Sequence, residues 1–255
     1  MRSGYRLFRI PSFILLLSSG QSPAADRPYD PLNLAGRRAP ELLDLTVIDS
    51  ERARDIPVRV YLPPEKLQSP VVLFSHGLGG SRAGYAYLGR HWAARGYVGV
   101  FLQHPGSDTS VWQDKPPSER MAAMRKAAGV ENFLLRVKDV PAVLDQLARW
   151  NDSRGHALEG RLDLTRAGMS GHSFGAVTTQ AVSGQRAGRG NMSFTDPRIK
   201  AAIPLSPSSP RGGDARRAFG NVSIPWLLMT GTKDVAIIGD ADVESRLAEI
   251  GRAHV

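Results

Sequence analysis

The 255-residue sequence contains no cysteine, which excludes disulfides, a cysteine nucleophile and thiolate metal ligands. Lysine is also scarce. Only six of the 33 basic residues are lysines, so arginine carries most of the formal net charge of +9. The arginines are spread along the chain and often lie beside acids, as in Glu51-Arg52-Ala53-Arg54-Asp55. A nucleic-acid interface needs basic residues clustered on one face, so we expect no nucleic-acid partner.

The sequence also lacks a hydrophobic run long enough to span a bilayer. Three arginines lie within the first nine residues, followed by a short apolar run at 10–17 and small residues at 22–25. This order of charged, apolar and small residues is typical of a secretory signal peptide, and the run is too short for a stable transmembrane helix. We therefore predict a signal peptide at residues 1–25, no membrane segment in the mature protein, and a secreted or periplasmic location.

Short apolar runs alternate with helical patterns through the rest of the chain. This alternation predicts a single α/β domain at residues 26–255, with a mostly parallel central sheet and helices on both faces. The polar stretch 107–128 shows no regular pattern. Strands are expected at 43–48, 58–62, 70–74, 97–102, 164–169, 201–205 and 226–229, the first two antiparallel, and helices at 83–95, 130–150 with a kink at Pro141, and 173–182.

The segment Gly171-His172-Ser173-Phe174-Gly175 lies between a predicted strand and a predicted helix. A Gly-x-Ser-x-Gly motif in this setting is typical of a nucleophilic serine on a tight turn, where side chains at the two glycine positions would clash. The helix N-terminus also favours negative charge developing beside the serine. We predict Ser173 as the nucleophile. His172 is adjacent on the same turn and is expected to point away and pack.

A second glycine-rich segment, His76-Gly77-Leu78-Gly79-Gly80, follows the buried strand 70–74. Glycines there allow backbone N–H groups to approach a substrate oxygen. The N–H of Leu78 and that of Phe174, directly after the nucleophile, are the two predicted donors of an oxyanion hole.

Together, Phe74-Ser75-His76-Gly77-Leu78-Gly79 and Gly171-His172-Ser173-Phe174-Gly175 resemble the platelet-activating-factor acetylhydrolase and dienelactone hydrolase group of α/β-hydrolases. Bacterial cutinase-like polyester hydrolases are similar at greater distance. The resemblance covers roughly residues 40–245 and implies an α/β-hydrolase fold and ester hydrolysis through an acyl-enzyme. It does not fix the acyl chain or the alcohol, and the substrate is a small-molecule or polymeric ester.

The strand 226–229 is followed by Gly231-Thr232-Lys233-Asp234, a position where this superfamily commonly carries its catalytic acid. The chain order serine, acid, histidine is then satisfied, and Asp234 is the predicted acid. Asp240 is the second candidate, and a surface turn is the alternative role for Asp234. Platelet-activating-factor acetylhydrolases place the acid one strand earlier, but the matching stretch 202–207 has no carboxylate.

The histidine base should follow Asp234, and His254 is the one histidine in that part of the sequence. No predicted strand or loop delivers it to Ser173, so the base is left unassigned. Four other histidines precede the motif: His76, His91, His104 and His156. His76 fits a structural role in the oxyanion loop. His104 ends a strand on the active-site side, where contact with substrate in the cleft and packing of the loop are equally compatible with the sequence.

The last seven residues, 249–255, read like a translated sequencing adapter, so we expect the natural protein to continue beyond about Ala248. The last strand and helix of the fold would then be absent from this chain, which we expect to be inactive alone because triad members act as a unit. The leading hypothesis is a serine esterase that needs no metal or cofactor. A peptidase or acyltransferase using the same site, or a binding protein on an inactive scaffold, are the alternatives.

Overall fold

The computed structural model describes residues 38–187, 192–208, 215–236, 238, 243, 244 and 246. These residues fall within one compact unit, Leu34–Val255. The predicted signal peptide at 1–25, the alternative acid Asp240 and the C-terminal His254 lie outside the described residues.

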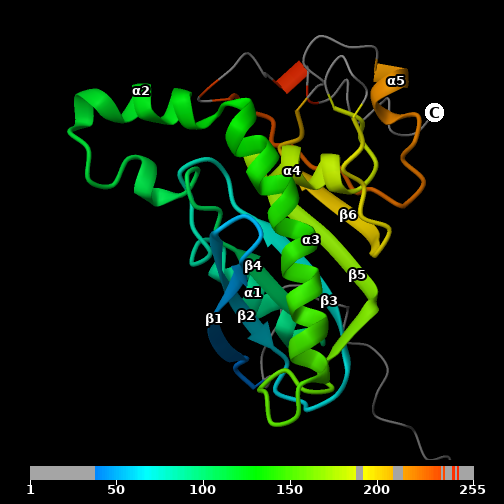
Figure 1. Cartoon of the computed structure of the whole chain (residues 1–255). Helices are drawn as coiled ribbons and strands as arrows, with labels where there is room; N and C mark the ends of the chain where they lie inside the picture. The colour runs from blue at the N-terminus through cyan, green and yellow to red at the C-terminus, as the bar shows by residue number, and fades with distance from the viewer. Residues whose placement is uncertain are drawn as a thin grey trace, which may run out of the picture. The chain divides into compact units, whose positions relative to one another are not determined.

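The core of the structure is a six-stranded sheet in the order β1-β2-β4-β3-β5-β6 (Figure 1). β1 pairs antiparallel with β2, and β2 antiparallel with β4, whereas β4, β3, β5 and β6 run parallel to one another. The mostly parallel sheet with an antiparallel start is therefore confirmed. The strands are β1 (Glu41–Asp49), β2 (Arg54–Leu62), β3 (Ser69–Ser75), β4 (Val98–Leu102), β5 (Leu162–His172) and β6 (Ile199–Leu205).

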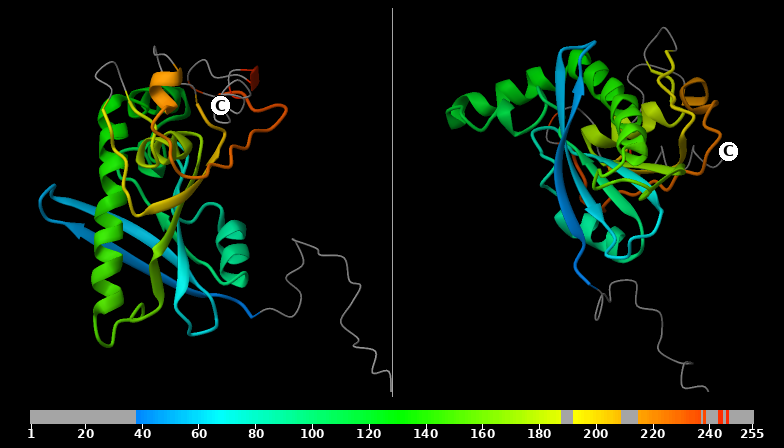
Figure 2. Two further views of the ribbon diagram at one scale, coloured as in Figure 1. Left: turned by 90° about the vertical axis from the view of Figure 1, so that its right-hand side faces the viewer. Right: turned by 60° about the horizontal axis from the view of Figure 1, so that its bottom comes forward.

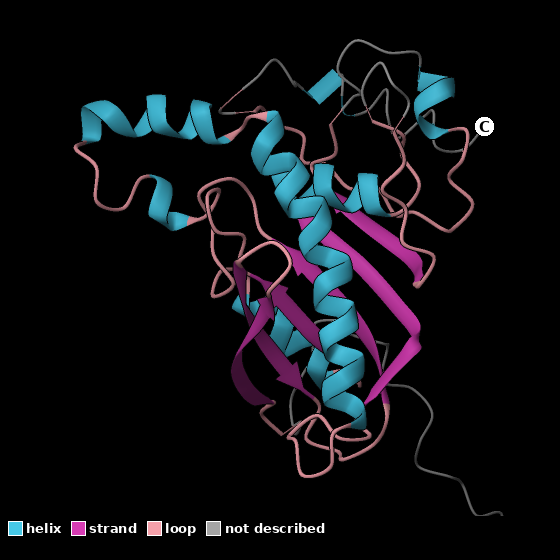
Figure 3. Ribbon diagram, in the orientation of Figure 1, coloured by secondary structure: helices cyan, strands magenta, loops and turns pink. Residues whose placement is uncertain are grey.

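Helices cover both faces of the sheet, as the sequence predicts (Figure 3). On one face α3 packs over the larger apolar cluster, and on the other α1 packs over a small aromatic cluster. The alternation of side chains along β4 divides the two: Val98, Val100 and Leu102 face α3, and Phe101 faces α1. The helices are α1 (Ala86–Ala94), α2 (Pro117–Ala127), α3 (Val130–Asp152), α4 (Phe174–Val182) and α5 (Ala215–Phe219), with a 3₁₀ turn η1 (Thr109–Val111).

Two sequence predictions need correction. The stretch 107–128 contains η1 and the eleven-residue α2, which projects away from the sheet (Figure 2). Its pattern is missed because α2 buries only Ala127 and so has no apolar stripe. The strand expected at 226–229 is present as two isolated parallel bridges, Ala202 to Trp226 and Leu205 to Met229.

The parallel strands bring three segments to one edge of the sheet. β3 ends before the glycine-rich loop 76–80, β5 ends before Ser173, and β6 ends at Leu205. Ser75 pairs with Gly171, and His172 pairs with Leu205, so these ends are level. Functional sites of open α/β sheets form at such carboxyl edges. Among the described residues no helix combines the length and the apolarity needed to cross a membrane.

Candidate active site

Ser173 occupies a strained turn between β5 and α4. Its backbone has φ 55° and ψ −114°, a conformation that L-residues rarely adopt. The turn is held from both sides, because Ser173 N–H donates to the carbonyl of Leu205 at 2.9 Å and its own carbonyl accepts from Val177 N–H at 3.1 Å. The strand-turn-helix setting predicted for the motif is thus present, and the half-buried serine is presented at the carboxyl edge of the sheet.

The two glycines of the motif are required by close backbone contacts. A Cβ atom on Gly171 would overlap the carbonyl of Gly175, and one on Gly175 would overlap the carbonyl of Ser75 at the end of β3. Any side chain at Gly175 would therefore push α4 away from the strand that leads into the oxyanion loop.

The loop 76–80 lies against the nucleophile turn. A Cβ placed on Gly77 would be 3.6 Å from Cβ of Ser173 and 3.4 Å from the carbonyl oxygen of His172. Within the described part of the chain, the N–H groups of Leu78 and Phe174 donate no hydrogen bond, whereas those of Gly79 and Gly80 donate to Ser107 and Gly77. The two N–H groups that the sequence selects therefore have no hydrogen-bond acceptor among the described residues.

Asp234 lies beyond the same edge, beside the end of β6. The chain leading to it is attached there through Ser206 N–H, which donates to the carbonyl of Met229 at 2.8 Å. The carboxylate accepts from Thr230 Oγ1 at 3.0 Å and lies 3.6 Å from Nε of Arg246. Burial opposes ionisation, but hydrogen bonds from Ser206 and Thr230 and the charge of Arg246 outweigh it and hold the pKa of Asp234 below its usual value.

Arg246 is a residue of this edge that the sequence reasoning missed. Its buried guanidinium donates to the carbonyls of Ser206 and Pro207 at 2.6 and 2.7 Å and to that of Asp234 at 3.3 Å. It therefore ties the acid-bearing turn to the segment that follows β6. No glycine motif or regular spacing marks such a residue in the sequence.

No described histidine is hydrogen-bonded to Ser173. Nδ1 of His172 is instead hydrogen-bonded to the hydroxyl of Tyr85 at 2.8 Å, in keeping with the packing role expected for His172. Burial is the main cause that lowers the pKa of His172, and the attraction of Asp234 only partly offsets it. His76 donates from Nδ1 to the carbonyl of Gly77 at 2.7 Å, so it stabilises the oxyanion loop from within.

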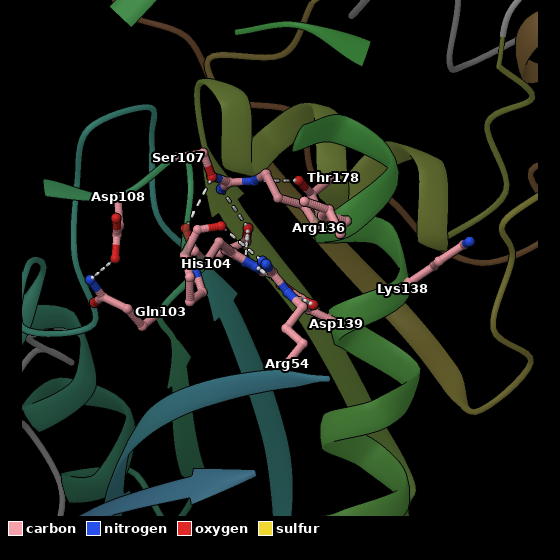
Figure 4. Close-up of polar contacts among 12 residues, drawn as sticks. Arg54, Gln103, His104, Ser107, Asp108, Arg136, Lys138, Asp139 and Thr178 are labelled. Carbon is pink, nitrogen blue, oxygen red and sulfur yellow. Dashed lines mark hydrogen bonds and ion pairs between the residues drawn. The ribbon is translucent and has the colours of Figure 1, made fainter. Parts of the chain in front are cut away.

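For His104 the sequence allows contact with substrate or packing of the loop. Its side chain is fully buried in this structure. Nδ1 bonds to the carboxylate of Asp139 and Nε2 to the hydroxyl of Ser75, each at 2.9 Å (Figure 4). Loop packing, the other role compatible with the sequence, is what the structure supports.

His104 belongs to a buried polar cluster beneath the site, formed by Ser75, His104, Ser107, Arg136 and Asp139. Arg136 donates to the hydroxyls of Ser75 and Ser107, both at 2.9 Å. The carboxylate of Asp139 also accepts from Arg54, the first residue of β2, and from Arg52 in the preceding turn. The cluster was missed from the sequence. One feature of the sequence could have indicated it: Arg136 lies on the apolar stripe of α3, at helical spacing from Val140, Val143 and Leu147.

The protonation states of this cluster follow from burial. Burial, reinforced by the charge of Arg136, lowers the pKa of His104 to about 4, so the ring is neutral near pH 7. Its Nδ1–H then donates to Asp139, and Nε2 accepts from the Ser75 hydroxyl. Burial alone would raise the pKa of Asp139. Hydrogen bonds from His104 and Arg54 outweigh burial and lower this pKa to about 2. The carboxylate is therefore ionised and balances the buried arginine.

No cluster of three or more His, Asp or Glu side chains suited to a metal ion is found in the described ranges. The arrangement of Ser173, two unengaged N–H groups and an ionised carboxylate at one edge can stabilise a tetrahedral oxyanion after attack by the serine.

Comparison with known proteins agrees with this geometry. The sequence profile described as "Platelet-activating factor acetylhydrolase, isoform II" matches residues 48–141. Cutinase 2 of Thermobifida cellulosilytica and Cutinase cut1 of Thermobifida fusca are each 28% identical over 170 residues, or 67% of this chain. The matched region covers 50% and 41% of those proteins, so the chain spans about half the length of the curated relatives it matches.

Solved structures show the same fold. A ferulic acid esterase from Streptomyces cinnamoneus superposes with a TM-score of 0.59 at 20% identity, covering 86% of this chain and 71% of that one. A cold-adapted esterase from an Arctic intertidal metagenomic library gives 0.57 at 18% identity, covering 84% and 80%. The predicted fold class is confirmed.

Proposed function

Because the chain is a member of the α/β-hydrolase superfamily, we propose that it is a serine hydrolase that cleaves carboxylic esters through an acyl-enzyme. The observation that supports this most strongly is Ser173 on its strained turn, packed against a loop whose Leu78 N–H is unengaged. The similarity to cutinases favours a polyester among the possible ester substrates.

In the proposed mechanism Ser173 attacks the acyl carbon, and the N–H groups of Leu78 and Phe174 bind the resulting oxyanion. Asp234 orients the histidine that takes the proton of Ser173 and later returns it to the leaving alcohol. That histidine is not among the described residues. Water then attacks the acyl-enzyme by the same route, which releases the acid and restores Ser173.

The test is hydrolysis of nitrophenyl esters from acetate to octanoate, and of an insoluble polyester, by the full-length gene product. An amino-acid nitroanilide measures peptidase activity in parallel. We expect ester turnover without anilide turnover, complete loss in Ser173→Ala, and a kcat about 10³–10⁴-fold lower in Asp234→Asn. Ser193→Ala and Asp55→Asn, at exposed sites, serve as matched controls.

Labelling with a fluorophosphonate probe separates an enzyme from a binding protein on the same scaffold. The probe should modify Ser173 and no other serine. Preferential turnover of the anilide would favour a peptidase, and absence of labelling at Ser173 would contradict the enzymatic proposal altogether.

We also propose that the protein is exported, on the strength of the charged, apolar and small residues at 1–25. Expression of the full-length gene with a C-terminal tag tests this. The mature protein should begin near Ala25 and leave the cytoplasm. A tagged product that stays in the cytoplasm with its N-terminus intact would contradict it.

A further inference from the structure

Arg136 is a fully buried charge placed beneath both halves of the candidate oxyanion hole. One terminal nitrogen of its guanidinium donates to the carbonyl of His76, the first residue of the oxyanion loop, and to the Ser75 hydroxyl. The other donates to Ser107, whose carbonyl accepts from Gly79 N–H of the same loop. Arg136 therefore fixes the oxyanion loop at its beginning and, through Ser107, at its middle.

The same guanidinium contacts the helix that begins at the nucleophile. Its Nε donates to Thr178 Oγ1 at 3.1 Å, and its carbon atom Cζ lies 4.6 Å from the centre of the Phe174 ring. Phe174 supplies the second predicted N–H donor. One side chain from α3 thus contacts residues next to both donors. Figure 4 shows Arg136 with its bonds to Ser107 and Thr178.

Stability alone does not explain this arginine. Replacing buried ionic groups by apolar residues of similar volume is often neutral or stabilising, whereas a planar guanidinium can hold several acceptors at fixed angles. The Ser75 hydroxyl donates a hydrogen bond to His104, and His104 bonds to Asp139, so the charge is balanced through a chain of oriented groups. Each acceptor on Arg136 is therefore held in one direction.

We propose that Arg136 is a positioning residue of the oxyanion hole, and that it holds the His76–Leu78 loop and Phe174 at the spacing that two N–H donors need to bind one oxygen. Because the peptide unit is planar, a fixed His76 carbonyl also fixes the Gly77 N–H and the direction in which the chain enters Gly77, the residue before Leu78. This inference rests on the proposed ester hydrolysis and assigns no contact between Arg136 and substrate.

The test compares Arg136→Met with Arg161→Met. Arg161 is also a buried arginine that donates to backbone carbonyls, those of Pro63 and Glu65, but it lies at the amino end of β5, away from the site. In Arg136→Met we expect kcat for a nitrophenyl ester to fall about 100-fold with KM within about threefold, comparable to losing an oxyanion donor. The affinity for a trifluoromethyl ketone should fall by a similar factor, since this inhibitor forms the oxyanion.

Hydrogen exchange provides a readout that does not depend on turnover. Peptides covering 76–80 and 173–178 should exchange faster in Arg136→Met and remain unchanged in Arg161→Met. If Arg136→Met does not fold, Arg136→Lys takes its place, since it keeps the charge but cannot hold the separated acceptors. In Arg136→Lys we expect the fall in kcat and the rise in hydrogen exchange to be about one tenth as large as in Arg136→Met.

Equal kcat and equal exchange in the Arg136 and Arg161 variants would overturn the positioning role while leaving ester hydrolysis intact. If the wild-type protein hydrolyses no ester and Ser173 is not labelled, the proposed function fails instead. The exchange experiment then decides by itself whether Arg136 orders the two segments.

Discussion

Ser173 keeps its unfavourable backbone conformation because every neighbouring group is fixed. A strained φ and ψ of this kind costs on the order of 1–3 kcal/mol and persists only where the surroundings over-determine it. Here the surroundings are the Leu205 carbonyl, the first turn of α4 and the contact between Gly175 and the end of β3. The glycines of the motif are thus explained by contacts of backbone with backbone.

Gly175→Ala should damage the site more than its size suggests. The added methyl group must displace the Ser75 carbonyl, so we expect a loss of about 1–3 kcal/mol in unfolding free energy and a marked drop in fluorophosphonate labelling. Urea unfolding and labelling rate measure the two effects. Gly168→Ala is the matched control, because its methyl group would make only ordinary contacts with the neighbouring strands β3 and β6. Equal labelling in both variants would show that the close contact does not position the nucleophile.

At the scale of elements, the projecting segment η1–α2 is attached to the oxyanion loop. Trp112 Nε1 donates to the carbonyl of Gly79 at 2.8 Å, and Gly79 N–H donates to Ser107 at 2.9 Å. Gly79 has φ 69°, and a Cβ there would overlap the side chains of Trp112 and Met124. The loop that carries Leu78 is therefore covered on its outer side by this segment and supported on its inner side by Arg136.

Trp112→Phe tests whether this outer attachment matters. A smaller aromatic ring replaces the indole and the hydrogen bond to Gly79 is lost, a net cost of about 1 kcal/mol, so kcat/KM for ester hydrolysis should fall about fivefold. Trp150→Phe at the far end of α3, where the indole stacks on His156, should leave the rate unchanged. A Trp112 variant with unaltered kcat/KM would indicate that the inner support is sufficient.

The sequence predicts those elements whose pattern depends on burial. β3 and β4 are continuous apolar runs because both faces of the sheet are covered there. The motif around Ser173 can be recognised in the sequence because close backbone contacts within a few residues require its glycines. α2 could not be found in this way because it buries one residue. Arg136 and Asp139 were missed because their partners lie 29 or more residues away in sequence and only the fold brings them together.

At the scale of the whole molecule, the buried cluster links α3 to the ends of β2, β3 and β4. Arg54 begins β2, Ser75 ends β3, and His104 follows β4, and all three bond to Arg136 or Asp139 of α3. A cluster of this kind is stable only when all its members are satisfied. Its proton occupancy therefore couples the stability of the fold to pH.

His104 should make the fold sensitive to acid. Its folded pKa is lowered to about 4, chiefly by burial and then by Arg136, whereas the unfolded chain regains the usual value of about 6.5. Between these values the unfolded state binds more protons, so the unfolding free energy falls as pH falls. The loss approaches about 1.4 kcal/mol per pH unit for this group and is complete below pH 4. Burial lowers the pKa of His76 as well, which adds to the effect.

Urea unfolding of wild type and His104→Gln between pH 8 and 4.5 measures this dependence. The variant should be less stable at pH 8, because Ser75 and Asp139 lose a well-placed partner. Its unfolding free energy should nevertheless fall less steeply as the pH is lowered. The slope against pH should be smaller by at most the equivalent of one bound proton, about 1.4 kcal/mol per pH unit. His156→Gln, which removes a half-exposed ring, controls for the loss of an imidazole. If wild type and His104→Gln share the same slope, the pKa of His104 does not differ between the folded and unfolded states, and the lowered pKa assigned to the folded state is wrong.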